Sequence, residues 1–244
     1  MLVTPLRQIE IAILAIWAVV LVAAFAFGQL SADHTRHSIR PLLMVTSALL
    51  VLLALLWWLA PVSGARSVPQ SVSLLIFLGM LFGFLGDLIM ADILRTPDRV
   101  IFGIGSFGIG HGCYIAAFLL ALRAIHAQSG RVNWIVMASL VLLGIVLWTG
   151  LVRNPDKPLP LNLAALVYTL LICIMVAFAI SLALAVPRLW YLALGALLFL
   201  ASDAILGNQI FRDHQWFLVS DVVWVTYIVG QLLIVRSNAV LKCL

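Results

Sequence analysis

Long apolar runs dominate this sequence and constrain its fold more than any other feature. A helix rises about 1.5 Å per residue and the hydrocarbon core of a bilayer is about 30 Å thick, so roughly 20 apolar residues form one span. Segments that meet this length are 9 to 28, 41 to 60, 72 to 92, 100 to 122, 132 to 152, 159 to 185, 188 to 208 and 215 to 236. We therefore expect an all-α fold, a polytopic membrane bundle of eight transmembrane helices that forms a single domain over residues 1–244. A membrane β-barrel is excluded because ten-residue segments of alternating polarity are lacking.

The composition excludes a soluble protein and a nucleic-acid partner. Apolar residues make up 65% of the chain and charged residues 9%, against about half and a quarter in soluble domains. The mean hydropathy is +1.21, and no stretch is polar enough to fold in water by itself. The 14 Lys and Arg residues are spread singly over the predicted loops and form no basic patch. The first run is too long for a signal peptide, and no small-residue cleavage site follows it, so we interpret it as a helix.

Charged residues divide unevenly between the two sides of the predicted bundle. Lys and Arg split seven to seven, but eight of the nine acidic residues lie on the side opposite the termini. If Arg40, Arg95 and Arg99 pair with aspartates inside the bundle, they drop out of this count and the remaining cations favour cytoplasmic termini. We expect a multi-pass protein of the bacterial inner (cell) membrane with cytoplasmic termini. The oligomeric state stays open.

The second to fourth and the sixth to eighth segments share a loose pattern. Asp87 follows Pro41 by 46 residues, and Asp203 follows Pro160 by 43. This spacing predicts a parallel repeat of two four-helix halves, with a site where the halves meet. Chance similarity is the alternative, because apolar helices align with one another easily.

Asp87 and Asp203 are the leading candidates for chemistry. An ionisable side chain inside a membrane costs several kcal/mol unless it is paired or hydrated, so its presence points to function. Each aspartate lies five residues before the expected end of its segment, and the two helices run in the same direction. We expect both carboxyls at one depth, about 7 to 8 Å below the same face. In a low-dielectric site two such carboxyls do not both ionise, so one can act as an acid and the other as a base. The structural alternative is that the two aspartates separately cap helices or pair with Arg95 and Arg40.

The fourth and eighth segments carry polar residues on single helical faces. Phe107, His111 and Tyr114 follow i, i+4, i+7 spacing, and a GxxxG pair in the third segment, Gly79 and Gly83, predicts close packing of the third helix against the fourth. That packing would bring His111 toward the carboxyls, although a lone helix histidine is more often a hydrogen-bonded packing residue. On the eighth segment the polar stripe, with Asp221 beside it, consists of Ser220, Trp224, Tyr227 and Gln231. Such a stripe faces protein or water rather than lipid.

The sequence gives little support to metal-dependent hydrolysis or to hydrolysis through a covalent intermediate. The chain has no HxxxH, HExxH or CxxC motif, and of its five histidines only His111 lies well inside a span. It also lacks GxSxG, and Ser202 adjoins Asp203, so their side chains point to different helix faces. We expect neither a metal nor another cofactor.

The order of these residues resembles the YhhN family of eight-span membrane proteins, which contains the lysoplasmalogenases. The resemblance covers nearly the whole chain and rests on Phe84-Leu85-Gly86-Asp87, Phe102-Gly103, Phe107, His111, Tyr114, Tyr168, Ser202-Asp203, Asn208, Phe211, Tyr227 and Gln231. Arg40-Pro41 falls where the family usually has a basic residue before proline, with Arg in place of the commoner Lys. Asp92 is an additional acid whose role the resemblance does not explain.

The resemblance implies hydrolysis of the vinyl ether bond of lysoplasmalogens, 1-alkenyl glycerophosphocholine or glycerophosphoethanolamine, to a fatty aldehyde and a glycerophospho-base. Protonation of the alkenyl β-carbon gives an oxocarbenium ion that water captures, so the reaction needs a proton donor and a negative charge. Asp87 and Asp203 supply both, and which is acid and which base stays open. Tyr227 and His111 would orient water or the ether oxygen, and Arg40 would meet the lipid phosphate. Tyr114, Tyr168, Ser202, Asn208 and Gln231 would support the site.

Two other functions fit the same pattern. A proton-coupled small transporter also needs buried acids, a repeat of two halves and no metal. A non-catalytic lipid-binding membrane protein could use its buried polar residues for helix association alone. In every case the expected partners are bilayer lipids, with a lysophospholipid as substrate for the hydrolase.

Overall fold

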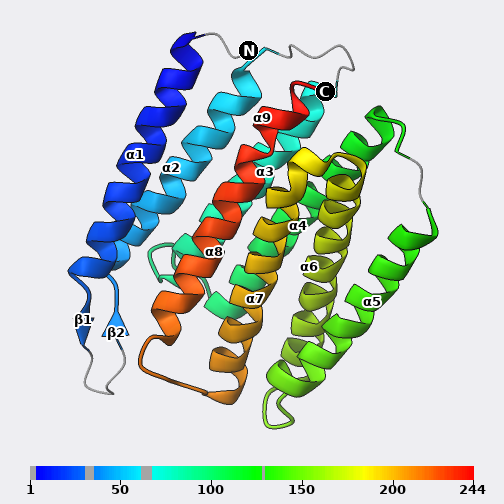
Figure 1. Cartoon of the computed structure of the whole chain (residues 1–244). Coiled ribbons are helices and arrows are strands. Elements are labelled where there is room, and N and C mark those ends of the chain that lie inside the picture. The colour runs from blue at the N-terminus through cyan, green and yellow to red at the C-terminus, as the bar shows by residue number, and fades with distance from the viewer. Residues whose placement is uncertain (1–3, 31–35, 62–67, 128–129) are drawn as a thin grey trace.

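The computed structural model describes residues 4–30, 36–61, 68–127 and 130–244, and it confirms the all-helical membrane bundle (Figure 1). Within these ranges, eight helices are long and apolar enough to cross a membrane. They are α1 Thr4–Ala26, α2 Arg40–Leu59, α3 Gln70–Met90, α4 Arg99–Ala124, α5 Arg131–Leu147, α6 Leu159–Ala185, α7 Trp190–Arg212 and α8 Val219–Arg236. Shorter elements are a π-helical turn at Trp148–Val152, a 3-10 turn at Pro187–Leu189 and α9 Asn238–Leu241.

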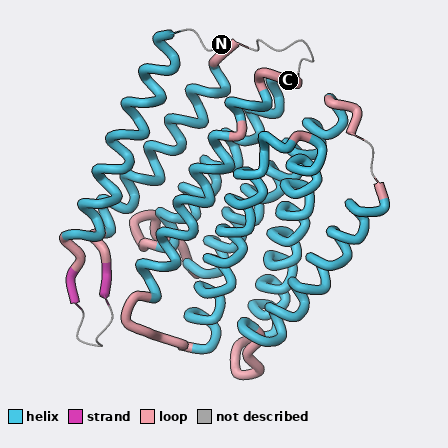
Figure 2. Tube along the Cα trace, viewed as in Figure 1, coloured by secondary structure: helices cyan, strands magenta, loops and turns pink. Residues whose placement is uncertain are grey.

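Consecutive helices run up and down the bundle, so α1 begins and α9 ends at the same end, which we call the terminal end (Figure 1). The opposite end carries the connections that lead into α2, α4, α6 and α8. A two-stranded antiparallel ribbon of β1 Gln29–Leu30 and β2 Arg36–His37 projects there between α1 and α2 (Figure 2). This ribbon was not expected from the sequence, and it is the single departure from helix and loop among the described residues.

Local sequence explains how several helices begin and end at this opposite end. Asp98 accepts hydrogen bonds from the backbone N–H groups of Val100 and Ile101, at 2.9 and 3.0 Å, and so caps the start of α4. Pro41 and Pro160 lie in the first turns of α2 and α6, where a missing N–H costs nothing. Asp213 ends α7 with φ of 54°, a left-handed conformation that aspartate tolerates better than most residues.

Two pairs of helices pack with their backbones in close contact. A Cβ added to Gly110 of α4 would lie 2.9 Å from the carbonyl oxygen of Gly79 in α3, which confirms the expected close packing of these helices. A Cβ at Gly230 of α8 would lie 2.7 Å from the carbonyl oxygen of Gly195 in α7. Glycine is therefore required at these crossings, and each crossing holds an aspartate-bearing helix against its neighbour.

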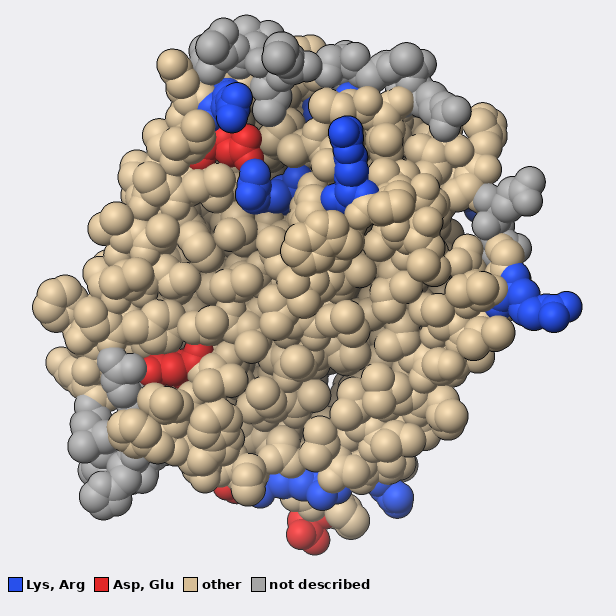
Figure 3. Space-filling view, in the orientation of Figure 1, with Lys and Arg blue, Asp and Glu red and all other residues tan. Residues whose placement is uncertain are grey.

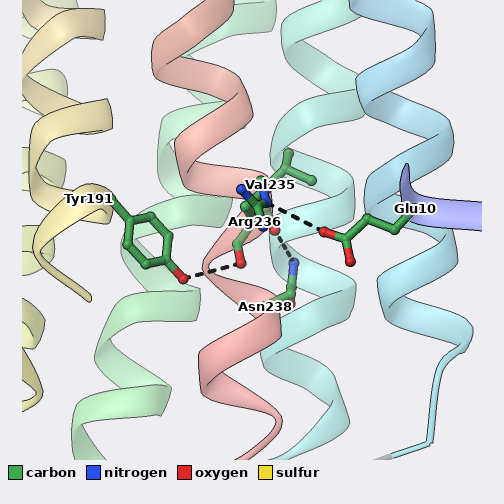
Figure 4. A network of polar contacts seen from close by, with 5 residues as sticks. All are labelled: Glu10, Tyr191, Val235, Arg236 and Asn238. Atoms are coloured by element: carbon green, nitrogen blue, oxygen red, sulfur yellow. Dashed lines mark hydrogen bonds and ion pairs between the residues drawn. The ribbon is translucent and has the colours of Figure 1, made fainter. Parts of the chain in front are cut away.

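Polar contacts at the terminal end join α1, α7 and α8 (Figure 4). Arg236 lies 3.4 Å from Oε1 of Glu10, and the Tyr191 hydroxyl donates to the Arg236 carbonyl oxygen at 3.4 Å. Asn238 donates to the Val235 carbonyl oxygen at 3.0 Å. On the face shown in Figure 3, charged side chains gather mainly near the two ends, with an apolar band between them. That distribution is the one that a bilayer imposes on a spanning bundle.

The structure differs from the sequence-based interpretation at four points. Helix α7 continues to Arg212 rather than ending at 208, because Arg212 donates hydrogen bonds to the Thr149 and Arg153 carbonyl oxygens, at 3.0 and 3.1 Å, beside the π-helical turn. Helix α8 begins at Val219 rather than 215, after a turn at residues 217–218. Arg40, Arg95 and Arg99 are not held inside the bundle, since all three are exposed. Helix α1 also begins earlier than expected, at Thr4.

Candidate active site

A cavity of about 610 Å³ lies at the end of the bundle opposite the termini, and both Asp87 and Asp203 line it. Its walls come from the first turns of α2, α4, α6 and α8 and from the last turns of α3 and α7. The volume falls in the range of sites that bind small molecules, about 300 to 1,000 Å³. The expectation that the two carboxyls face one shared space is therefore met.

Asp87 is buried near the end of α3 and accepts two hydrogen bonds on the same oxygen. The Ser47 hydroxyl of α2 donates to Oδ2 at 2.5 Å, and the Tyr227 hydroxyl of α8 donates to Oδ2 at 2.9 Å. Because both donors use Oδ2, the geometry leaves Oδ1 as the oxygen that can carry or give up a proton. Three helices thus fix the orientation of this carboxyl.

Asp203 lies in the corresponding part of α7 and is partly exposed. The Tyr168 hydroxyl of α6 donates a hydrogen bond to its Oδ2. Tyr168 and Asp203 also line a second, smaller pocket that adjoins the cavity. This carboxyl is therefore oriented by a neighbouring helix, as Asp87 is, but it has more access to the cavity.

Aromatic rings and an amide form the inner end of the site. Tyr227 contacts the rings of Phe107, Phe199 and Trp224, with centroids 6.0, 5.1 and 5.4 Å away. The hydroxyl of Tyr114 donates to Oε1 of Gln231 at 2.6 Å. Ser220, Trp224 and Tyr227 line the cavity, so the polar stripe of α8 faces protein and cavity, as expected.

His111 is fully enclosed by aromatic rings. The centroid of its ring lies 4.7 Å from that of Phe199, 5.4 Å from that of Tyr168 and 6.5 Å from that of Tyr114. Neither ring nitrogen has a hydrogen-bond partner among the residues that the structure describes. A buried imidazole normally satisfies at least one nitrogen, and His111 lines neither the cavity nor the smaller pocket beside it. Through Tyr168, His111 adjoins the residue that orients Asp203.

Cationic side chains surround the outer part of the cavity. Arg40 lies at the first residue of α2, Arg99 at the first residue of α4, and Lys157 just before α6, and all three line the cavity. None of them forms an ion pair with another residue in the described ranges. Asp213 and Asp221 line the same region, and Asp221 accepts a hydrogen bond from the Ser38 hydroxyl at 2.8 Å. The rim thus presents both signs of charge.

Two of the predicted residues serve contacts between helices. The Ser202 hydroxyl donates to the Val223 carbonyl oxygen at 2.9 Å, so it joins α7 to α8 beside the cavity. Asn208 donates to the Leu151 carbonyl oxygen at 2.9 Å and so holds the π-helical turn against α7. Asn208 does not line the cavity.

Sequence reasoning did not assign Ser47, Arg99 and Lys157 to the site, although it considered Arg99 as a possible partner of the aspartates. Ser47 follows Arg40 by seven residues, two turns of one helix, so both lie on the same face of α2. That spacing was a usable signal for Ser47. Arg99 and Lys157 gave no comparable signal, because each lies at a helix start and joins the site through the arrangement of whole helices. Asp92, the additional acid, is exposed and does not line the cavity.

Comparison with known proteins identifies relatives of this chain. The model of the YhhN family matches residues 35–238. A lysoplasmalogenase of Mycobacterium bovis and one of Mycobacterium tuberculosis are each 29% identical to it over 135 residues, which cover 55% of this chain and 49% of theirs. The match thus spans about half the length of these curated relatives. No solved structure matches significantly.

Proposed function

Because this chain belongs to the YhhN family, we propose that it is an ether hydrolase that cleaves the vinyl ether bond of lysoplasmalogens. The products would be a fatty aldehyde and glycerophosphocholine or glycerophosphoethanolamine. One observation carries the proposal: two carboxyls from corresponding helices line a single cavity large enough for a glycerophospho group. The names of the two mycobacterial relatives support the same reaction.

The reaction begins with transfer of a proton from a carboxyl to the β-carbon of the alkenyl group. The ether oxygen then shares the positive charge as an oxocarbenium ion, which a second, ionised carboxylate stabilises. That carboxylate removes a proton from water as the water oxygen bonds to the α-carbon. The bond between the hemiacetal carbon and the glycerol oxygen then breaks: the glycerol oxygen takes the proton held by the second carboxyl, the hemiacetal hydroxyl returns a proton to the first carboxyl, and the aldehyde leaves. One water molecule is consumed and no redox partner is required.

We assign the proton donor to Asp87 and the base to Asp203. Asp87 is the more buried of the two, and a low-dielectric environment disfavours its charged form. Its Oδ1 is left for the proton because Ser47 and Tyr227 both occupy Oδ2. Asp203 has more access to the cavity, from which water would enter, and the Tyr168 hydroxyl donates to it. Tyr227 and His111 are positioning residues in this assignment.

The rim of the cavity suits the polar part of the substrate. A phosphate group between Arg40, Arg99 and Lys157 would form charge-assisted hydrogen bonds with them. Asp213 would lie near the ammonium group of choline or ethanolamine on the same rim. The substrate would then enter from the interface with its headgroup outward and its alkenyl group inward.

We propose a bacterial cell membrane as the location, with cytoplasmic termini. Both curated relatives are bacterial. Arg40, Arg99 and Lys157 line the cavity and so act in the site rather than as loop charges. Without these three, the side opposite the termini keeps four Lys and Arg residues against seven on the terminal side. That excess favours termini on the cytoplasmic side.

The test is an assay of purified protein with choline and ethanolamine lysoplasmalogens, with ester and saturated ether analogues as controls. We expect aldehyde from the alkenyl substrates alone. Asp87→Asn and Asp203→Asn should each lower the rate at least about a hundredfold, the scale of a lost general acid or base. Both variants should still insert and run as monodisperse protein.

Asp92→Asn is the matched control, because Asp92 is an exposed aspartate outside the cavity. Its left-handed backbone, with φ of 59°, suits asparagine. We expect its activity to stay within about twofold of the unsubstituted protein, the margin of a surface change. Equal hydrolysis of the saturated ether, or full activity of either cavity variant, would contradict proton transfer to carbon by these aspartates.

A further inference from the structure

A second pocket of about 60 Å³ adjoins the cavity beside Asp203 and Tyr168. The residues that line both spaces include Met90, Phe107, Asp203 and Phe211, so the pocket and the cavity share part of their walls. Apart from Asp203, its lining has no charged side chain. The hydroxyl of Thr169, another lining residue, is satisfied within its own helix, since it donates to the Ala165 carbonyl oxygen at 2.8 Å. The pocket therefore offers an apolar surface that begins at the candidate base.

We propose that this pocket binds the first carbons of the substrate's hydrocarbon chain, those that follow the vinyl ether group. This inference rests on the proposed function. The headgroup and the chain leave the vinyl ether in opposite directions, and the cationic rim accounts for only the headgroup. The chain then extends from the carboxyls into this adjoining apolar pocket.

The volume of the pocket limits how much chain it holds. A water-sized group occupies about 10 to 15 Å³ of cavity volume. The pocket of about 60 Å³ therefore holds roughly four carbon atoms. The rest of a long chain must continue elsewhere. Small residues of α6 and α7, namely Ala165, Ala204 and Gly207, form part of the lining, and the apolar band of Figure 3 has a small hollow over the lower parts of these helices. A longer chain would pass there into the bilayer.

The first measurement is kcat/KM for water-soluble alkenyl glycerophosphocholines that differ in chain length by one methylene. Burial of each methylene should raise kcat/KM by about fourfold over the first four or so carbons beyond the vinyl group. Beyond that length the increase should stop, because further carbons leave the pocket. A slope that stays constant to long chains, or no dependence at all, would overturn the inference.

Ala165→Phe and the milder Ala165→Leu test the location. Ala165 is buried and lines the pocket but not the cavity. We expect both variants to flatten the chain-length series while activity on the shortest substrate stays within about threefold. Ala164→Phe is the matched control, since Ala164 is next to Ala165 on the same helix but lines neither space. Equal slopes in Ala165→Leu, in folded and monodisperse protein, would reject this site for the chain.

A third measurement does not depend on activity. A saturated ether lysophospholipid that carries a diazirine three carbons from the ether oxygen should crosslink to α6 or α7 residues of the pocket. Crosslinks should fall at least tenfold in Ala165→Phe but not in Ala164→Phe. If the protein hydrolyses no vinyl ether yet crosslinks in this pattern, the proposed reaction fails while the chain site stands. If the protein hydrolyses the vinyl ether but crosslinks only to other helices, the proposed reaction stands while the chain site fails.

Discussion

The surroundings of Asp87 and Asp203 are alike in framework and different in chemistry. Each aspartate lies eight residues after a glycine, Gly79 or Gly195, whose backbone contacts a glycine of the following helix. In each case a hydroxyl of the preceding helix donates a hydrogen bond to the carboxyl. The donor is Ser47 of α2 for Asp87 and Tyr168 of α6 for Asp203. These parallels agree with a repeat of two four-helix halves, which stays a prediction.

The difference lies in the helix that follows each aspartate. Tyr227 of α8 donates to Asp87 and so joins the two predicted halves, whereas Tyr114 of α4, its counterpart in the predicted repeat, donates to Gln231 instead. Asp87 therefore has two hydroxyl donors among the described side chains, and Asp203 has one. One framework thus places two identical residues in unequal environments, which is what separate acid and base roles require.

The largest effect expected from this comparison concerns the hydroxyl donors. Tyr168→Phe removes the one side-chain donor that the structure gives Asp203, and a hydrogen bond to a charged group contributes about 1.5 to 3 kcal/mol. We expect kcat to fall by tenfold or more. Ser47→Ala or Tyr227→Phe alone should cost only several-fold, because each leaves Asp87 the other donor. The double variant Ser47→Ala/Tyr227→Phe should lose about as much as Tyr168→Phe.

Tyr191→Phe is the control for this series, since its hydroxyl lies at the terminal end and donates to the Arg236 carbonyl oxygen. Its kcat should be unchanged within twofold. If Tyr227→Phe alone matched the loss in Tyr168→Phe, the two carboxyls would depend equally on a single donor and the comparison would fail.

A smaller effect is expected at the rim. Arg40→Ala should raise KM for lysoplasmalogens by about fivefold with little change in kcat, the scale of one partly exposed charge contact. The triple change of Arg40, Arg99 and Lys157 to Ala should raise KM further. Arg95→Ala is the control, because Arg95 is exposed but does not line the cavity. A fall in kcat with unchanged KM would contradict a role for the rim in binding the headgroup.

The fold and part of the site could be predicted from the sequence. Eight spans follow from hydropathy, and Asp87, Asp203 and Tyr227 are conspicuous because polar groups are costly in lipid. Ser47 is less conspicuous: its spacing from Arg40 was a usable signal, but a serine in a membrane helix commonly satisfies its own backbone. The end of α7 was missed for a related reason: Arg212 and Asn208 extend it through hydrogen bonds to the segment between α5 and α6. Contacts between distant segments leave no local pattern.

The smallest effect is expected at the terminal end, far from both carboxyls. Arg236→Gln removes the ion pair with Glu10, whose side chain is 9% exposed. We expect a loss of about 1 kcal/mol in stability, measured as a Tm lower by a few degrees, because the Arg236 side chain is 48% exposed and solvent screens its attraction to Glu10. Glu10→Gln should have a similar effect, and the double variant should lose less than the sum of the two if the pair interacts directly.

Hydrolysis by Arg236→Gln should stay within twofold, and this expectation separates the proposed hydrolase from a transporter. In the hydrolase, the reaction takes place in a cavity at one end, and the terminal end only holds α1, α7 and α8 together. A transporter must alternately open both ends around a shared site, so contacts at the terminal end set the balance between its states. If Arg236→Gln altered activity as strongly as Tyr168→Phe, the two ends would be coupled. That result would favour alternating access over hydrolysis at one end.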